Sequence, residues 1–248
     1  MKISHTRVLV DEGDFTSSEA WEESRNQVTA SIKSVNWPPG NDEFVIKPES
    51  TGNGVSPITD SFEEILENKN GWSSTGRTHL KTVLHQMGLF DDVIEKLSPY
   101  YDDPEDFISS PWFDAVRELN VEGESELSVV EWETGNISSS HRSLNRITLG
   151  LVTGIITAGV VILPTREMYQ YLTDRVGNYP ELEPYFVIWE SLSSEVDNGV
   201  IEVMAVEHDA TSNNVPLTGK LKDGMSDRDV SNVGIDQSEN GQSGLDSY

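Results

Sequence analysis

The stretch from residue 129 to residue 146 constrains the fold most, because it joins an apolar run, two acids and a basic segment. It reads Val-Val-Glu-Trp-Glu-Thr-Gly-Asn-Ile-Ser-Ser-Ser-His-Arg-Ser-Leu-Asn-Arg. We predict a buried strand that ends in two carboxylates, then a turn and a helix. Side chains two positions apart on a strand share a face, so Glu131 and Glu133 project together. Both stay ionised only beside a positive charge. A divalent cation is the simplest candidate, and a solvated acidic edge strand is the alternative.

A second acid-bearing strand is expected just before this stretch, over residues 112–119. If it pairs with the strand over residues 127–132 as an antiparallel hairpin, Asp114 and Glu131 meet at one end. The connection between the two strands is long, polar and acidic. It therefore leaves Glu122 as an alternative to Asp114.

These acids suggest distinct roles in metal-dependent hydrolysis. We expect Asp114 and Glu131 to bind the metal together with the backbone carbonyl of Trp132. Glu133 is expected to be a second-site ligand or the general base that deprotonates water. Two glutamates on an earlier expected helix are not expected to join the site, namely Glu63 and Glu64.

The helix expected over residues 138–156 begins with three serines, which are N-cap candidates. Helix N-termini attract anions through free N–H groups and the helix dipole. His141, Arg142 and Arg146 add basic groups there, and the two arginines share a face at i, i+4 spacing. Arg166, which follows the next strand, is expected to face the same cleft. We therefore expect these four residues to bind phosphate groups, with ion pairs to the acidic surface as the alternative.

The remaining hydrophobic patterns predict further elements. Strands are expected over residues 6–10, 44–46, 160–163 and 200–206. Helices are expected over residues 19–35, 60–68, 78–87, 91–97 and 166–176. This order of elements predicts a mixed α/β fold, in which a mixed sheet is flanked by helices and the acidic motif lies near its centre.

The chain is strongly acidic. Its 248 residues include 17 lysines and arginines against 43 aspartates and glutamates, a net charge of −26. Taken alone, this charge argues against nucleic acid as a partner, because DNA-binding proteins usually carry a basic patch. A large acidic excess with few lysines is also typical of halophilic proteins, in which charge maintains solubility in molar salt. We favour the halophilic interpretation. Molar salt limits repulsion to about 3 Å, which leaves DNA open as a partner.

The chain has no cysteine, which excludes disulfides and thiolate zinc sites and is compatible with a cytoplasmic protein. The N-terminus shows no signal-peptide pattern. Residues 147–164 carry no charge and approach the length of a membrane span. Their threonines and glycines favour a buried helix that turns into a buried strand, so we expect no membrane partner.

The order of these residues resembles the PD-(D/E)XK nuclease superfamily, and within it the BamHI/BglII branch of type II restriction endonucleases. Phe-Asp-Ala-Val-Arg at 113–117 and Val-Glu-Trp-Glu-Thr-Gly-Asn at 130–136 are similar to the two acidic strands of that branch. Like this chain with Glu133, the branch lacks the lysine that most of the superfamily has at the third position. The segments Asn-Trp-Pro, Gly-Asn-Gly-Val and Asn-Gly-Trp, which begin at residues 36, 52 and 70, also resemble its N-terminal half.

The resemblance implies a magnesium-dependent homodimer that cleaves double-stranded DNA at a short palindrome. It implies a nuclease domain over residues 1–209, with a restriction-endonuclease-like core at about 60–207. Residues 210–248 turn to Ser, Asn, Asp and Gly without periodicity, so we expect a disordered acidic tail with a short ordered piece near 215–221. Two alternatives stay open: a repair or structure-specific nuclease of the same fold, and an inactive acidic binding protein.

Overall fold

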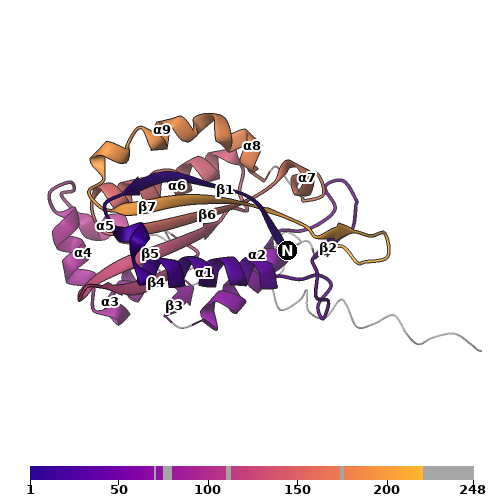
Figure 1. Ribbon diagram of the computed structural model, residues 1–248, viewed down its shortest axis with the longest axis horizontal. Helices are drawn as coiled ribbons and strands as arrows, with labels where there is room; N and C mark the ends of the chain where they lie inside the picture. Colours follow the sequence, from indigo (N-terminus) through magenta and orange to yellow (C-terminus); the bar gives the residue numbers. More distant parts are fainter. Residues whose placement is uncertain (70, 75–79, 110–112, 174–175, 220–248) are drawn as a thin grey trace, which may run out of the picture.

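The computed structural model describes residues 1–69, 71–74, 80–109, 113–173 and 176–219. Its centre is a six-stranded sheet in the order β1-β7-β6-β5-β4-β3, and a small separate sheet joins β2 to β8 (Figure 1). The strands are β1 (Lys2–Glu12), β2 (Val45–Ile46), β3 (Trp72–Ser74), β4 (Ala115–Val121), β5 (Glu124–Trp132), β6 (Ala158–Pro164), β7 (Gly199–Glu207) and β8 (Ala210–Thr211).

The middle of the large sheet is parallel and its flanks are antiparallel. β6 pairs parallel with both β5 and β7. β1 joins β7 antiparallel, and β4 joins both β3 and β5 antiparallel. Parallel strands require crossover connections, which place helices on the faces of the sheet. This mixed sheet flanked by helices confirms the predicted fold class.

Helices cover both faces of the sheet. They are α1 (Glu19–Ser34), α2 (Ser56–Glu67), α3 (Leu80–Met87), α4 (Phe90–Leu97), α5 (Pro104–Ile108), α6 (Ile137–Val152), α7 (Arg166–Tyr169), α8 (Tyr179–Leu182) and α9 (Phe186–Glu190). α6, α8 and α9 lie on one face, and α1 and α2 lie on the other (Figure 1). Buried residues of α3, α4 and α5 belong to the core on the α6 face.

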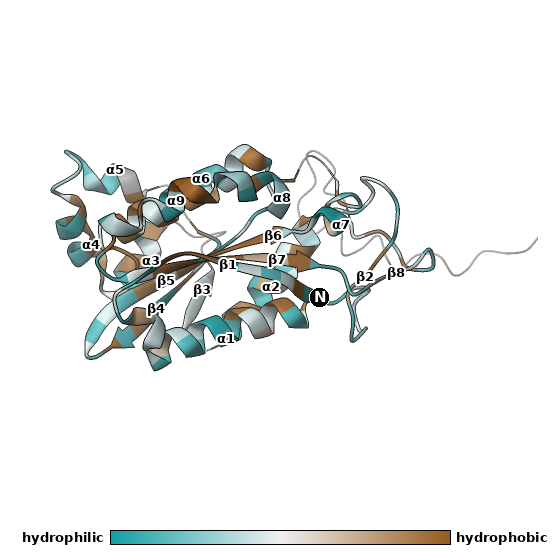
Figure 2. Ribbon diagram, turned by 45° about the horizontal axis from the view of Figure 1, so that its top comes forward, coloured by the Kyte–Doolittle hydropathy of each residue, from teal (hydrophilic) through white to brown (hydrophobic). Residues whose placement is uncertain are grey.

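Side-chain alternation along the strands builds one core on each face. Val129 and Val161 belong to the core under α6, whereas Val130 and Val160 belong to the core under α1 and α2. All seven residues of β6 are buried, and the strand is brown in Figure 2. The charge-free run at 147–164 is therefore the end of α6 followed by β6. Within the described ranges, the helices are too short or too polar to cross a bilayer.

The β4–β5 hairpin is longer than expected. Pairing continues to Val121 opposite Glu124, so the turn between the strands is the pair Glu122 and Gly123. Both turn residues have positive φ values, 56° and 98°, as tight two-residue hairpin turns require. The long polar connection that we expected between the two strands is therefore wrong, because most of its residues belong to the strands themselves.

Two predicted helices begin or end at residues other than those expected. α2 begins at Ser56 rather than at residue 60, with a proline in its first turn, where the missing N–H is not needed. The helix expected over 166–176 ends at Tyr169, because the following segment pairs with a distant loop. There the N–H of Asn53 donates to Tyr171 O at 2.9 Å.

The chain after β7 stays in contact with the rest of the fold. β8 pairs with β2, and Thr218 N–H donates to Asn53 Oδ1 at 3.3 Å. The same buried amide donates from Nδ2 to Lys47 O at 2.9 Å and to Tyr171 O at 3.0 Å. The tail expected from residue 210 therefore begins with an ordered stretch, which includes part of the piece expected near 215–221. The rest of that tail, from residue 220, lies outside the described residues.

Candidate active site

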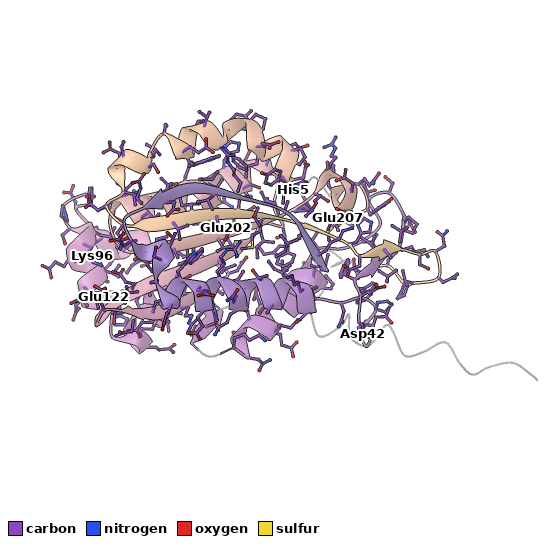
Figure 3. The ribbon with its side chains drawn as sticks, viewed as in Figure 1. His5, Asp42, Lys96, Glu122, Glu202 and Glu207 are labelled. Carbon is purple, nitrogen blue, oxygen red and sulfur yellow. The ribbon has the colours of Figure 1, made fainter. Side chains whose placement is uncertain are left out.

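Asp114 and Glu131 lie side by side at the end of the β4–β5 hairpin opposite its turn. The N–H of Asp114 donates to Val130 O at 3.0 Å and to Glu131 Oε2 at 3.1 Å. In return, the N–H of Trp132 donates to Asp114 Oδ2 at 2.6 Å. The structure thus brings together the two acids that the sequence predicted to meet. Glu122, the alternative first acid, lies in the turn at the far end of the hairpin (Figure 3), too far away to join Glu131.

Glu133 follows β5 directly and continues its direction. Its N–H donates to Ile162 O of β6 at 2.9 Å, so Glu131 and Glu133 face the same side of the sheet, toward α6. The Glu133 side chain is buried, at 4% exposure. β5 lies between β4 and β6, which excludes the alternative of a solvated edge strand.

The N-cap of α6 is Asn136 rather than one of the serines predicted at 138–140. Its Oδ1 accepts two backbone N–H groups of the first turn, at 3.0 and 3.3 Å. The preceding turn is tight, because a Cβ on Gly135 would lie 2.5 Å from Ser139 Oγ. α6 then ends at Val152, before the predicted residue 156. The early turns of α6 consequently lie beside the two glutamates.

Two serines of α6 hydrogen-bond to these glutamates. Ser143 Oγ donates to Glu131 Oε1 at 3.0 Å and is also in hydrogen-bond contact with Glu133 Oε1. Ser140 Oγ donates to Glu133 Oε2 at 3.4 Å. From the sequence, Ser140 is only a helix-cap candidate, and no role is predicted for Ser143. Their i, i+3 spacing is the signal that they share a face.

Burial raises the pKa of all three acids. It raises the pKa of Asp114 to about 7, and the charges of Glu63 and Glu133 add to this effect. Burial also raises the pKa of Glu131 well above its usual range, and repulsion from Asp114 and Glu133 contributes. For Glu133, burial raises the pKa, whereas hydrogen bonds from the two serines oppose it. Acids whose charged forms are disfavoured gain strongly from a nearby cation.

Arg142 and Arg146 lie within electrostatic range of these acids, as their shared helix face predicted. Both arginines lower the pKa of Glu133, and Arg146 also lowers that of Glu131. Arg146 is half-buried, and burial and the charge of Arg142 lower its own pKa. Arg142 Nη2 also donates to Ser139 Oγ at 3.3 Å, in the first turn of the helix. The acids and a pair of cations thus share one end of the fold.

The contacts that place the side chains of His141 and Arg166 are with residues other than the three acids. The His141 ring centroid lies 4.7 Å from that of Tyr185 and 5.4 Å from that of Trp189, so it packs toward α9. Arg166 Nη1 pairs with Glu181 Oε1 at 3.1 Å. For Arg166 this is the ion-pair alternative that the sequence left open. Sequence spacing placed both residues near the site but did not fix the direction of their side chains.

Glu63, on α2, is an acid that was not expected to join the site. Its charge raises the pKa of Asp114, so it lies within electrostatic range of the site. Glu64, the next residue, is exposed. The position of Glu63 follows from the packing of α2 against the sheet, where the Phe62 and Trp132 ring centroids are 4.9 Å apart. No local sequence pattern reveals that contact.

The donor atoms at the hairpin end suit a hard divalent cation. Two carboxylates and a backbone carbonyl, from Asp114, Glu131 and Trp132, are the oxygen ligands that magnesium and calcium prefer. Within the described part of the chain, no three carboxylate or imidazole groups already form a closed metal cage. That is compatible with magnesium, which usually keeps several waters and is held by one or two carboxylates together with substrate phosphates.

Comparison with known proteins identifies the family. The family model "Restriction endonuclease BamHI" matches residues 1–225. The type II restriction enzyme OkrAI of Oceanobacter kriegii is 36% identical over 228 residues, which cover 92% of this chain and 100% of that protein. The type II restriction enzyme BamHI of Bacillus amyloliquefaciens is 32% identical over 229 residues, or 88% of this chain and 94% of that protein. The resemblance seen in the acidic strands is confirmed, and the chain belongs to the BamHI family of restriction endonucleases.

Proposed function

We propose that this chain is a magnesium-dependent endonuclease that cleaves double-stranded DNA at a defined sequence. Its membership of a restriction endonuclease family makes it a site-specific DNA endonuclease. The observation that supports the chemistry is the cluster of Asp114, Glu131 and Glu133, whose pKa values are all raised, within range of two arginine charges. Such a cluster is expected where a cation and a phosphate must be bound together.

In this proposal, Asp114 and Glu131 hold the metal together with the carbonyl oxygen of Trp132. The hydrogen bond from Trp132 N–H to Asp114 Oδ2 ties the two ligand-bearing segments to each other. When bound, the cation neutralises charge on the phosphate and lowers the pKa of coordinated water.

Glu133 is the proposed general base. It accepts a proton from water as the water oxygen bonds to phosphorus, and the bond from phosphorus to the 3′ oxygen breaks. The leaving oxygen then takes a proton from solvent water. Arg142 and Arg146 stabilise the negative charge of the phosphates, and their range to Glu133 supports this role.

We further propose that two copies act together, because each copy contributes one acidic cluster and a duplex has two strands. Apolar side chains are exposed in and after α9, with Val187 at 63%, Ile188 at 52% and Leu192 at 37%. β1 lies beside α9 and adds Val8, which is 46% exposed. A second copy of the chain would cover this apolar surface. Ile188→Asp is expected to give monomers in sedimentation experiments, and an unchanged dimer would contradict this interface.

The acidic composition leads us to propose action in concentrated salt, in the cytoplasm of a halophile. A net charge of −26 repels DNA at low ionic strength, and salt screens this repulsion. Cleavage in a potassium chloride series is therefore expected to be highest in the molar range. Maximal cleavage at low salt, with loss at high salt, would contradict a halophilic origin.

The deciding experiment incubates the purified protein with unmethylated plasmid and phage DNA, with and without magnesium, across that salt series. Glu131→Ala removes a proposed ligand, and Glu122→Ala is the matched control at the other end of the hairpin. Discrete fragments that need magnesium and Glu131, but not Glu122, are the expected result. Non-specific nicking that still needs Glu131 would indicate a structure-specific nuclease. No cleavage and no magnesium binding would leave an inactive binding protein.

A further inference from the structure

Ser143 joins the two glutamates of β5 through one hydroxyl group. Its Oγ donates to Glu131 Oε1 at 3.0 Å and is also in hydrogen-bond contact with Glu133 Oε1. The side chain is 2% exposed, so water does not compete freely for these contacts. One atom on α6 therefore touches both carboxylates, which come from the same strand.

The bridge sets the relative position of two groups that otherwise repel each other. Charges on Glu131 and Glu133 project from one face of the strand, two residues apart. The second oxygen of Glu131 accepts the N–H of Asp114 at 3.1 Å, and the second oxygen of Glu133 accepts the Ser140 hydroxyl at 3.4 Å. Each carboxylate thus has one oxygen on Ser143 and the other on a separate donor.

Core packing and capping hydrogen bonds hold α6, the helix that carries Ser143, in position. Leu144 and Ile147, on the same helix, are wholly buried in the core between α6 and the sheet. At the start of the helix, Asn136 caps the first turn, and Gly177 N–H donates to Gly135 O at 2.7 Å. Because the helix is rigid, a hydroxyl that it carries restricts the conformations of the glutamate side chains to which it is hydrogen-bonded.

We propose that Ser143 is a positioning residue, which holds Glu131 and Glu133 in the arrangement that binds a divalent cation and orients water. This inference rests on the proposed function, because it concerns the same acidic cluster. Hydrogen bonds to metal-binding side chains fix their orientation, and removing such a partner typically weakens metal binding or activity by about 10- to 100-fold. Ser143 has this relation to Glu131, and the same atom links Glu131 to the proposed general base.

The test compares Ser143→Ala with Ser140→Ala. Both variants delete one buried hydroxyl from the same helix, but Ser140 contacts one carboxylate only, at 3.4 Å. Calorimetric titration with Mn²⁺ in the absence of DNA gives the metal affinity of each folded protein. We expect Ser143→Ala to weaken binding by about 10-fold or more and Ser140→Ala to bind close to wild type. Ser143→Thr, which keeps a hydroxyl, is expected to recover part of the loss.

Cleavage kinetics separate positioning from simple stability. Ser143→Ala is expected to lower kcat at saturating Mn²⁺ while KM for DNA stays near the wild-type value, because the arginines remain in place. A purely structural serine would lower the melting temperature and leave Mn²⁺ affinity and kcat unchanged, which would overturn the inference. In that case loss of Mn²⁺ binding in Glu131→Gln would still support the proposed function. A wild-type protein that neither binds Mn²⁺ nor cleaves DNA would overturn both.

Discussion

Replacing Asp114 by asparagine is expected to stabilise the metal-free protein near neutral pH while abolishing cleavage. Asparagine has the same shape, and its amide oxygen can still accept the N–H of Trp132, which donates to Asp114 Oδ2 at 2.6 Å. The substitution removes a charge that burial and neighbouring acids disfavour, notably Glu63 and Glu133. A proposed metal ligand is lost in the same step, so stability and activity should change in opposite directions.

The size of the stabilisation follows from the pKa. The fold raises the pKa of Asp114 from 3.8 to about 7. At about 1.4 kcal/mol for each pH unit, the charged form is disfavoured by at most about 4 kcal/mol. Because the side chain is partly exposed, solvent screens some of this energy, and we expect the variant to gain about 2 kcal/mol in free energy of unfolding.

The gain in free energy of unfolding of the Asp114→Asn variant should increase as the pH rises. The folded protein holds the Asp114 proton more tightly than the unfolded chain does, because the folded pKa is the higher one. The wild type therefore loses stability as the pH rises from about 4 to about 7, and the full penalty is present above that range. The asparagine variant lacks this loss, so the two proteins should converge in stability at about pH 4.

Urea unfolding in the presence of a chelator measures the difference, at about pH 8 and about pH 4. Glu122→Gln removes a carboxylate from the exposed hairpin turn and is the matched control, which should change neither stability nor cleavage. Magnesium should then stabilise the wild type more than the Asp114→Asn variant. A variant less stable than the wild type at the higher pH, or a difference that does not change with pH, would refute the reasoning.

Three further substitutions, with Arg7→Met as a control, test other parts of the structure. Arg146→Ala should weaken binding of DNA without metal and reduce the salt dependence of binding by about one counterion, measured by fluorescence anisotropy; an unchanged slope would place Arg146 away from the phosphates. Arg25→Met should lower the free energy of unfolding by about 3 kcal/mol, because it leaves the buried carboxylate of Glu202 unpaired. Arg7→Met breaks an exposed pair and is the control for urea unfolding, with little expected effect. Asn53→Ala should cost about 3 kcal/mol and expose the segment near residue 218 to proteases, since it removes three hydrogen bonds of a buried side chain; full protease resistance would contradict this.

Sequence reasoning located Asp114 and Glu131 together because strand alternation and hairpin pairing are local properties of the chain. The same reasoning misjudged the hairpin between them, since exposed polar residues at its tip hide the strand period. Leu119 and Leu127, which are buried at 3% and 5%, were the apolar positions that signal strands there. The turn lacks the usual Asn-Gly or Asp-Gly pair and uses Glu122 at positive φ.

Other parts of the site depend on packing between distant elements. Ser143 reaches the glutamates only because the early turns of α6 lie beside the end of β5, and Glu63 approaches Asp114 only because α2 packs against the sheet. Helical spacing shows which residues share a face, but it does not show what that face contacts. The sequence therefore predicted Arg142 and Arg146 as a pair, but it did not predict that His141, on the same helix, packs against Trp189.

Two glutamates in the same sheet, the buried Glu202 and the half-buried Glu131, show how a structural carboxylate differs from one held for a ligand. Glu202, in the middle of β7 (Figure 3), is 1% exposed and accepts two hydrogen bonds of 2.7 Å from the Arg25 guanidinium. Glu131 instead accepts hydrogen bonds from a serine hydroxyl and a backbone N–H, which are neutral donors. A charge-assisted pair compensates the buried charge of Glu202, whereas neutral donors compensate that of Glu131 only in part.

The same substitution at these two positions should therefore have opposite effects. Glu202→Gln weakens a charge-assisted pair and should destabilise the protein, with cleavage retained. Glu131→Gln removes a charge that burial and neighbouring acids disfavour, so it should stabilise the metal-free protein and abolish cleavage. Urea unfolding with a chelator compares both variants with the wild type. If Glu131→Gln were destabilising to the same degree as Glu202→Gln, the fold itself would compensate the Glu131 charge, and a cation would not be needed to explain the site.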